Sequence, residues 1–259
     1  MFFGKEINIG SLGKNKIKIT VTNEESNGVP IVIAPGFLTE HSEDWENFLK
    51  KHINTKIIYV NWQSSSALLM AKRALFSMLP SWTSALYTLG PGWLRAGGVL
   101  TSLWEIYKVW SRAADEANSA GVALARFLND VWDDDDKGIF IGHSLGVRVI
   151  TAAMASLKSD NILSSISIAG AIDVDEYEDR IKKTKCQERV KHTNIFSDND
   201  AILKYLYIPA ELSFSPLGLE KSKLPCVNNI LTDIGHTEYH DKEMFSEMII
   251  DLYNDALNK

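Results

Sequence analysis

Two hydrophobic patterns alternate along most of the chain. Short runs that are apolar at every position are typical of parallel strands buried on both faces, and an apolar residue about every three to four positions indicates an amphipathic helix. The first pattern predicts a strand over residues 29–37, and five further segments are strand candidates: 56–62, 138–143, 164–170, 192–197 and 226–231. The second predicts helices over residues 43–52, 145–157, 174–184, 200–207 and 241–257.

This alternation sets the expected fold class. Strands that take turns with helices form βαβ units, so we predict an α/β fold in which a mostly parallel sheet carries helices on both faces. Residues 5–22 differ, because apolar and polar residues alternate on either side of Gly13-Lys14-Asn15, which predicts a β-hairpin. The length is compatible with one domain, and we expect a single domain over residues 1–259.

Residues 63–137 form a segment longer than a simple crossover between parallel strands needs. We expect a helical insertion there, either as buried crossover helices or as a cap over a pocket. Residues 74–94 carry no charge, but Pro80 and Pro91 interrupt them, which disfavours a membrane span. A cap would present its tryptophans to an apolar substrate or to a lipid surface: Trp82, Trp93, Trp104 and Trp110.

Composition narrows the class of partner. The formal net charge is -6 at pH 7, so we expect no nucleic-acid partner, because such binding needs a basic surface. Cys186 and Cys226 are too few for a disulfide framework and lack the paired spacing of zinc sites. The segment 1–10 becomes charged at Lys5 before any long apolar stretch, so we predict no secretory signal and a cytoplasmic protein.

The sequence Gly142-His143-Ser144-Leu145-Gly146 lies where a predicted strand meets a predicted helix. A sharp turn at such a junction exposes a serine hydroxyl and crowds the residues two before and two after it, so both must be small. Glycines occupy both positions. The turn also directs the Leu145 N–H to the place where an oxyanion forms, near the positive end of the helix. Ser144 is therefore the candidate nucleophile.

The candidate acid comes from the loop after the strand that ends near residue 197, because an acid and then a base are expected on later strands. Asp200 is preferred, since it precedes a predicted helix with its side chain turned back to the loop. Asp198 is the alternative acid, with a helix cap as its other expected role. Asp173 and Asp175 follow an earlier strand and are expected in the first turn of a helix.

The candidate base is His236, which follows the last predicted strand beside Gly235 and precedes the final helix. His240 competes for this role, although we expect it on the surface at the start of a helix. Three other histidines come too early in the chain for that loop: His41, His52 and His192.

A second oxyanion donor is expected in the loop after residues 29–37. Gly36 allows the backbone to approach a reacting carbonyl, and the Phe37 N–H would then donate to the oxyanion. A plain Pro-Gly turn is the alternative interpretation. His41 and Trp62 are expected either to line the pocket or to be structural.

Six segments combine these motifs: IAPGFLTEHSEDWENF, YVNWQSS, SRAADEANSAGVALARFLND, IGHSLGVRVI, NIFSDNDAILKYL and NNILTDIGHTEYH. Together they resemble the α/β-hydrolase family that includes the transmembrane and coiled-coil domain-containing proteins, over about residues 31–240. The resemblance implies a serine-hydrolase scaffold. The family's Ser-x-Asn-Asp pattern falls on residues 197–200, which supports Asp200 as the acid, and its Gly-His falls on Gly235 and His236. Larger members carry added membrane-spanning or coiled-coil regions, so we expect a minimal core here.

These features predict a serine hydrolase that cleaves a carboxylic ester through Ser144, His236 and Asp200. The apolar insertion favours an apolar or lipid-like ester as the small-molecule substrate. No metal or organic cofactor is expected, and residues 133–136, although all aspartate, are interpreted as a solvated turn. Two alternatives remain open: a thioesterase or amidase with the same triad, and a non-catalytic scaffold that binds a partner or a membrane through the Trp-rich insertion.

Overall fold

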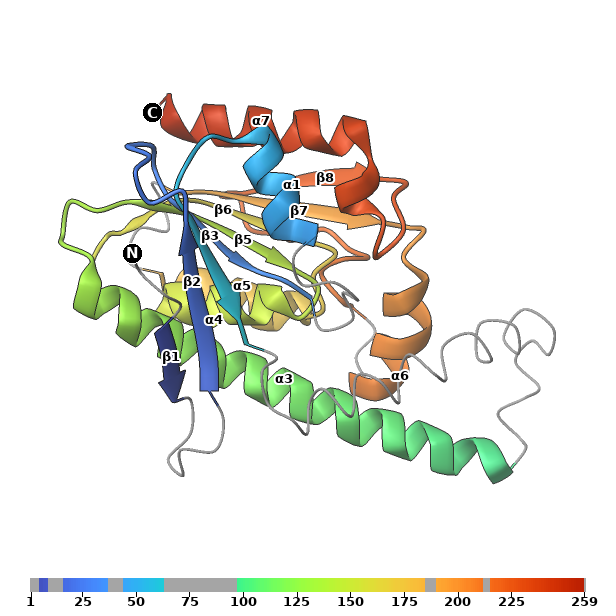
Figure 1. The fold of residues 1–259 in the computed structure, drawn as a ribbon. Helices are drawn as coiled ribbons and strands as arrows, with labels where there is room; N and C mark the ends of the chain where they lie inside the picture. The colour runs from blue at the N-terminus through green and yellow to red at the C-terminus, as the bar shows by residue number, and fades with distance from the viewer. Residues whose placement is uncertain are drawn as a thin grey trace.

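The computed structural model describes residues 5–8, 16–36, 44–62, 97–184, 190–211 and 215–258. Within them the chain forms three layers, with one sheet between two layers of helices (Figure 1). The sheet has eight strands in the order β1-β2-β4-β3-β5-β6-β7-β8. This arrangement agrees with the predicted α/β architecture.

The strands are β1 (Lys5–Asn8), β2 (Lys16–Thr22), β3 (Ile31–Ala34), β4 (Ile57–Asn61), β5 (Gly138–His143), β6 (Ile162–Ile168), β7 (Lys191–Ser197) and β8 (Val227–Thr232). The first two pair in antiparallel fashion, with Lys5 opposite Ile19, as the predicted hairpin requires. β2 is also antiparallel to β4, and β3 to β8 all run parallel to one another. The carboxyl ends of β5, β7 and β8 therefore lie at one edge of the sheet.

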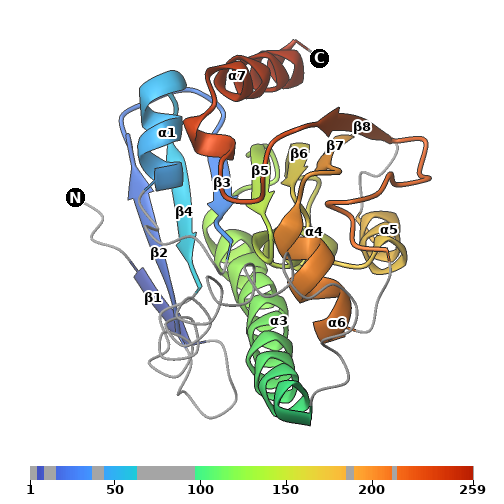
Figure 2. The same ribbon diagram turned by 90° about the vertical axis from the view of Figure 1, so that its right-hand side faces the viewer.

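The helical elements are α1 (Asp44–His52), α3 (Gly97–Val131), α4 (Gly146–Ser156), α5 (Val174–Lys182), the π-helix η2 (Leu203–Tyr207), α6 (Ile208–Glu211), the 3-10 helix η3 (Tyr239–Asp241) and α7 (Glu243–Leu257). α1 and α7 cover one face of the sheet, and α3, α4 and α5 cover the other (Figures 1 and 2). Along β3, Ile31 and Ile33 pack with the α1 and α7 side, while Val32 and Ala34 pack with α3 and α4. Burial on both faces explains why this strand is apolar throughout.

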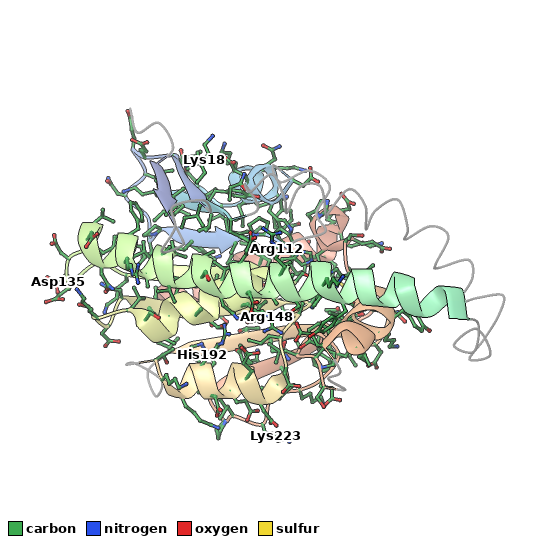
Figure 3. The ribbon with its side chains drawn as sticks, turned by 90° about the horizontal axis from the view of Figure 1, so that it is seen from below. Lys18, Arg112, Asp135, Arg148, His192 and Lys223 are labelled. Carbon is green, nitrogen blue, oxygen red and sulfur yellow. The ribbon has the colours of Figure 1, made fainter. Side chains whose placement is uncertain are left out.

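The long helix α3 has 35 residues, so it measures about 52 Å. It runs along α4, and its N-terminal end extends past the sheet (Figures 1 and 3). Close packing depends on Gly121, where a Cβ atom would lie 2.4 Å from the Val149 carbonyl oxygen of α4. α3 accounts for part of the predicted insertion over residues 63–137. Residues 63–96 lie outside the described residues, and the single domain with an inserted cap stays a prediction.

None of the helices in the described part of the chain combines the length and apolar character needed to cross a membrane.

Candidate active site

Ser144 lies in the turn between β5 and α4, at the predicted junction. Its φ angle is 55°, in the left-handed region that residues with a Cβ rarely adopt. A non-glycine residue held there costs about 1–3 kcal/mol and persists only where the surroundings enforce it. Asn23 and Ala169 are the other non-glycine residues with a positive φ angle in the described part of the chain.

The two glycines around Ser144 are required by close contacts. A Cβ atom on Gly142 would lie 2.8 Å from the Gly146 carbonyl oxygen. A Cβ atom on Gly146 would lie only 2.0 Å from the carbonyl oxygen of Ala34 in β3. Any larger residue at either position forces the backbone apart, which explains the spacing of the glycines about the serine.

The structure brings Ser144, His236 and Asp200 together from three different loops. His236 Nε2 lies 2.8 Å from Ser144 Oγ, and His236 Nδ1 lies 2.6 Å from Asp200 Oδ2. These loops follow β5, β8 and β7 in turn, so all three residues lie at the carboxyl edge of the sheet. Residues 92 positions apart in sequence thus come within hydrogen-bond distance.

The hydrogen bonds fix the direction of proton donation. An ionised carboxylate only accepts, so the His236 Nδ1–H donates to Asp200, and Nε2 is left to accept from the Ser144 hydroxyl. Asp200 is held in turn, because its second oxygen, Oδ1, accepts from the Leu203 N–H at 2.8 Å. One carboxylate thus caps the following helix and orients the imidazole.

The other candidate acids and the other candidate base lie elsewhere. The side chain of Asp198 is exposed, and Asp200 rather than Asp198 caps the following helix. Asp173 caps α5 by accepting from the Asp175 N–H at 2.9 Å. His240 Nε2 lies 3.8 Å from Asp44 Oδ2, in contact with α1.

One predicted oxyanion donor can be placed. Leu145 is buried and immediately precedes α4, so its N–H belongs to the positive end of that helix. Gly36 approaches this turn closely, since a Cβ there would lie 2.8 Å from Ser144 Cβ. Phe37 and His41 lie outside the described residues. Trp62 is structural, because its buried indole N–H donates to the Pro35 carbonyl at 2.9 Å and braces the backbone next to Gly36.

His143 contacts the base, a role that the sequence analysis did not identify. Its Nε2–H donates to the His236 carbonyl at 2.8 Å, and the two ring centroids are 5.2 Å apart. Burial, and then the charge of His236, lower the pKa of His143 from 6.5 to about 3, so this imidazole is neutral. Only its position beside the serine hinted at such a contact.

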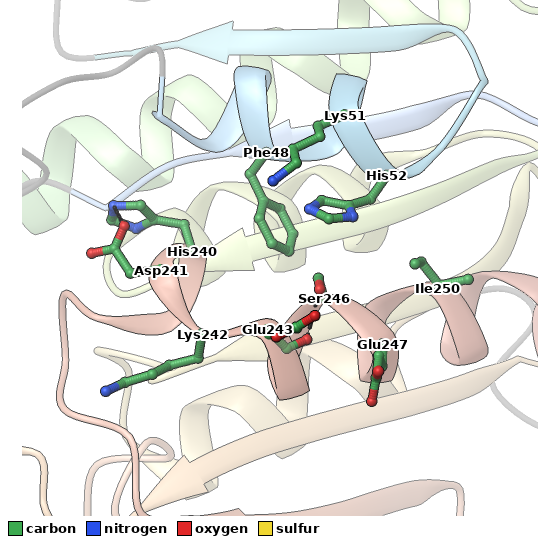
Figure 4. Close-up of a pocket in the computed structure, with 10 residues that line it drawn as sticks. All are labelled: Phe48, Lys51, His52, His240, Asp241, Lys242, Glu243, Ser246, Glu247 and Ile250. Atoms are coloured by element: carbon green, nitrogen blue, oxygen red, sulfur yellow. Dashed lines mark hydrogen bonds and ion pairs between the residues drawn. The ribbon is translucent and has the colours of Figure 1, made fainter.

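The three side chains are almost completely shielded from solvent. The exposed fraction is 1% for Ser144, 4% for His236 and 0% for Asp200. Two surface cavities formed by described residues, of about 510 and 520 Å³, are lined by none of them. The first lies between α1, η3 and the start of α7 (Figure 4), and the second lies beside Asp198 and β8.

Trp110 does not have the surface position that a lipid contact requires. It is fully buried in α3, where its indole N–H donates to Glu211 at 3.0 Å and its ring packs edge-on against Tyr207. The apolar ring faces the core because α6 and η2 pack against this part of α3. Trp82, Trp93 and the side chain of Trp104 lie outside the described part of the structure.

Comparison of the sequence with known proteins finds one family. A family model described as "Protein of unknown function (DUF726)" matches residues 97–248. No curated protein matches the chain in sequence.

Three solved structures illustrate the structural likeness. A putative aryl esterase from Burkholderia cenocepacia is 12% identical, the match covers 99% of this chain and 100% of that one, and the TM-score is 0.52. An esterase from Exiguobacterium antarcticum is 11% identical, the match covers 97% of this chain and 100% of that one, and the TM-score is 0.52. A proline iminopeptidase from Mycobacterium smegmatis is 7% identical, the match covers 98% of each chain, and the TM-score is 0.51. The chain therefore has an α/β-hydrolase fold, as predicted from its sequence.

Proposed function

We propose that this chain, which belongs to the DUF726 family of proteins of unknown function, is a serine hydrolase that cleaves carboxylic esters. The observation that carries the proposal is the hydrogen-bonded series from Ser144 Oγ through the His236 imidazole to Asp200, at 2.8 and 2.6 Å. The left-handed backbone of Ser144 supports it, because strain of this kind is concentrated at functional sites.

In the proposed reaction, Ser144 Oγ attacks the ester carbonyl while His236 Nε2 takes the hydroxyl proton. Asp200 keeps the imidazole in the tautomer that accepts this proton and stabilises the imidazolium that forms. The N–H groups of Leu145 and Phe37 bind the tetrahedral oxyanion. His236 then returns the proton to the departing alcohol, which leaves an acyl group on Ser144.

The second half of the reaction regenerates the enzyme. His236 takes a proton from water, and the resulting hydroxide attacks the acyl carbonyl on Ser144. The second tetrahedral intermediate collapses to a carboxylic acid, and the proton on His236 returns to Ser144 Oγ. Every proton is passed between groups of the site, the substrate and water, so the cycle needs no cofactor.

The substrate class is a further part of the proposal. The uncharged stretch over residues 74–94 supports an apolar or lipid-like ester, and contact of the Trp-rich insertion with a membrane surface stays a prediction. The fold alone leaves the leaving group open, because the similar structures include esterases and an iminopeptidase. Cytoplasmic location and closer kinship with the transmembrane and coiled-coil domain-containing proteins also stay predictions.

The experiment is hydrolysis of p-nitrophenyl esters of increasing acyl length, with a matched thioester and anilide, by the intact protein and by Ser144→Ala. We expect esters to be cleaved fastest, longer chains to be preferred, and Ser144→Ala to be inactive. Ser167→Ala, a change at another buried serine, is the control and should retain full activity. Preference for the thioester or the anilide would replace the ester assignment while keeping the triad.

The burial of Ser144 favours a second candidate function, a non-catalytic scaffold that binds a partner. The hydrogen-bonded series from Ser144 through His236 to Asp200 argues against it, because a non-catalytic scaffold has no need of that arrangement. Folded protein that cleaves none of these substrates would favour the scaffold.

A further inference from the structure

Arg148 lies in the first turns of α4, shortly after Ser144, and its side chain is only 6% exposed. Its Nη1 lies 3.0 Å from Glu176 Oε2 in α5, and its Nη2 lies 3.1 Å from Glu211 Oε1 in α6. Its Nε–H donates to the Ala171 carbonyl at 2.9 Å. Figure 3 shows Arg148 next to α3, on the side of the sheet that α3, α4 and α5 cover. One buried guanidinium thus joins three segments of the chain.

One of these connections reaches the backbone of the nucleophile. The Ala171 N–H donates to the Ser144 carbonyl at 3.1 Å, and the Ala171 carbonyl accepts from Arg148. The Arg148 N–H also donates to the Leu145 carbonyl at 3.0 Å. Arg148 therefore holds the turn that carries Ser144 from two directions.

Another connection reaches the acid. Residues 201–211 form one continuous helical segment that begins directly after Asp200 and ends at Glu211. Asp200 caps this segment through Leu203, so the position of the carboxylate follows that of the helix. At the other end, Glu211 Oε1 is held by both Arg148 and the Trp110 indole N–H.

We propose that Arg148 is a positioning residue that sets the distance between Asp200 and Ser144 through its ion pair with Glu211. The inference rests on the proposed function, in which Arg148 contacts neither substrate nor reacting atoms. Its effect passes through the helix that it anchors. The π-helical turn η2 lies between the acid and the anchor, and such turns are frequent at functional sites.

Glu176 provides a matched comparison for Glu211. Both carboxylates bind the same guanidinium at nearly the same distance, 3.0 and 3.1 Å. Glu176, however, lies in α5, which carries none of the three site residues, and it also pairs with Arg180. Loss of either carboxylate removes one ion pair of Arg148, but only loss of Glu211 releases the helix that follows Asp200.

The test compares Glu211→Gln with Glu176→Gln in the rate of reaction with a fluorophosphonate probe, per folded molecule. A small displacement in a catalytic group can cost up to about a hundredfold in rate, so we expect a loss of about tenfold or more for Glu211→Gln. Glu176→Gln should stay within about twofold of the intact protein, because no site residue moves. Arg148→Lys, which cannot bind all three partners, should behave as Glu211→Gln does.

Two further measurements separate positioning from a general loss of structure. In an Asp200→Asn background, Glu211→Gln should cause no further loss, because the group through which it acts is already disabled. Should Glu211→Gln fold poorly, Glu211→Asp keeps the charge but withdraws it by one methylene, and it should slow the reaction more than Glu176→Asp does. Equal rates for the paired Glu211 and Glu176 variants, or an added loss in the Asp200→Asn background, would overturn the inference.

A spectroscopic readout distinguishes this inference from the proposed function. The short hydrogen bond from His236 to Asp200 should give a low-field proton resonance in the NMR spectrum of the folded protein. Glu211→Gln should shift or broaden this resonance, and Glu176→Gln should leave it unchanged. A responsive resonance in a protein that never reacts with the probe would reject the hydrolase and keep the positioning role. If the protein reacts with the probe but neither variant changes the resonance, the hydrolase is kept and the positioning role is rejected.

Discussion

Gly146 and Ala34 lie so close that a Cβ atom on Gly146 would sit 2.0 Å from the Ala34 carbonyl oxygen. The contact joins the start of α4 to the end of β3, and so brings the turn that carries Ser144 against the loop after β3. Both oxyanion donors of the proposed mechanism depend on this approach, because one comes from each side of the contact.

Gly146→Ala should therefore destabilise the protein by about 3 kcal/mol or more, because backbone rather than a flexible side chain must move. Urea unfolding measures the change. The control is Gly235→Ala, because the three atoms nearest to its new Cβ all belong to the mostly exposed side chain of Glu238, with Oε1 at 3.0 Å. That change should stay within about 0.5 kcal/mol of the intact protein. If the two variants were equally stable, Gly146 would not lie as close to the Ala34 carbonyl oxygen as described.

Asp200→Asn should lower the rate of ester cleavage by about 10³–10⁴-fold. The oxygen of the new amide is needed by the Leu203 N–H, so the amide nitrogen faces His236 and favours the tautomer that cannot accept the Ser144 proton. Initial rates measure this loss.

Asp198→Asn serves as its control, because the Asp198 side chain is exposed and lies outside the hydrogen-bonded series. Its rate should stay within about threefold of the intact protein. If the two variants lost activity equally, the assignment of Asp200 as the acid would fail.

Ser144→Gly should be more stable than Ser144→Ala by about 1 kcal/mol, although both lack the hydroxyl. Only glycine adopts a φ angle of 55° without strain from a Cβ atom. Denaturant unfolding of the two variants gives the difference. Ala153→Gly in α4, where the backbone is helical, should instead lower the stability. A Ser144→Ala protein as stable as Ser144→Gly would show that the turn is relaxed in solution.

Stability should fall as the pH drops from 6.5 toward 3, in part because of His143. Burial lowers its pKa to about 3, so below pH 6.5 the unfolded chain binds a proton that the native protein does not. The contribution of this group is complete above pH 6.5 and is lost on acidification, by at most about 1.4 kcal/mol per pH unit.

His143→Gln removes this titration and keeps a donor for the His236 carbonyl. The free energy of unfolding should therefore depend less steeply on pH in the variant than in the intact protein. Denaturant unfolding between about pH 4 and about pH 7 measures this dependence. An unchanged slope would mean that His143 is accessible and charged in the native protein.

The hydrophobic pattern predicted the sheet well, because burial on both faces leaves a direct mark in sequence. β3, β4 and β5 lie within the ranges predicted for them, β7 begins one residue before its predicted range, and α7 begins two residues after the predicted helix start. The glycine spacing likewise identified the turn at Ser144, since steric crowding acts between residues that are neighbours in sequence.

The connections of Arg148 could not be predicted in the same way. Its partners Glu176 and Glu211 lie far along the chain, and only the packing of α5 and α6 beside α4 brings them to the guanidinium. A lone arginine in an apolar helical segment indicates a buried ion pair but does not identify the partner. The burial of Ser144 is equally a property of the tertiary structure, with no counterpart in its local sequence.

The central claim is that Ser144 is a nucleophile activated by His236. Mass spectrometry of the folded protein after reaction with a fluorophosphonate, followed by peptide mapping, tests it directly. The proposed site predicts a single adduct on the peptide that contains Ser144, absent from Ser144→Ala and retained in Ser167→Ala. Folded protein without an adduct, or an adduct that persists in Ser144→Ala, would contradict it.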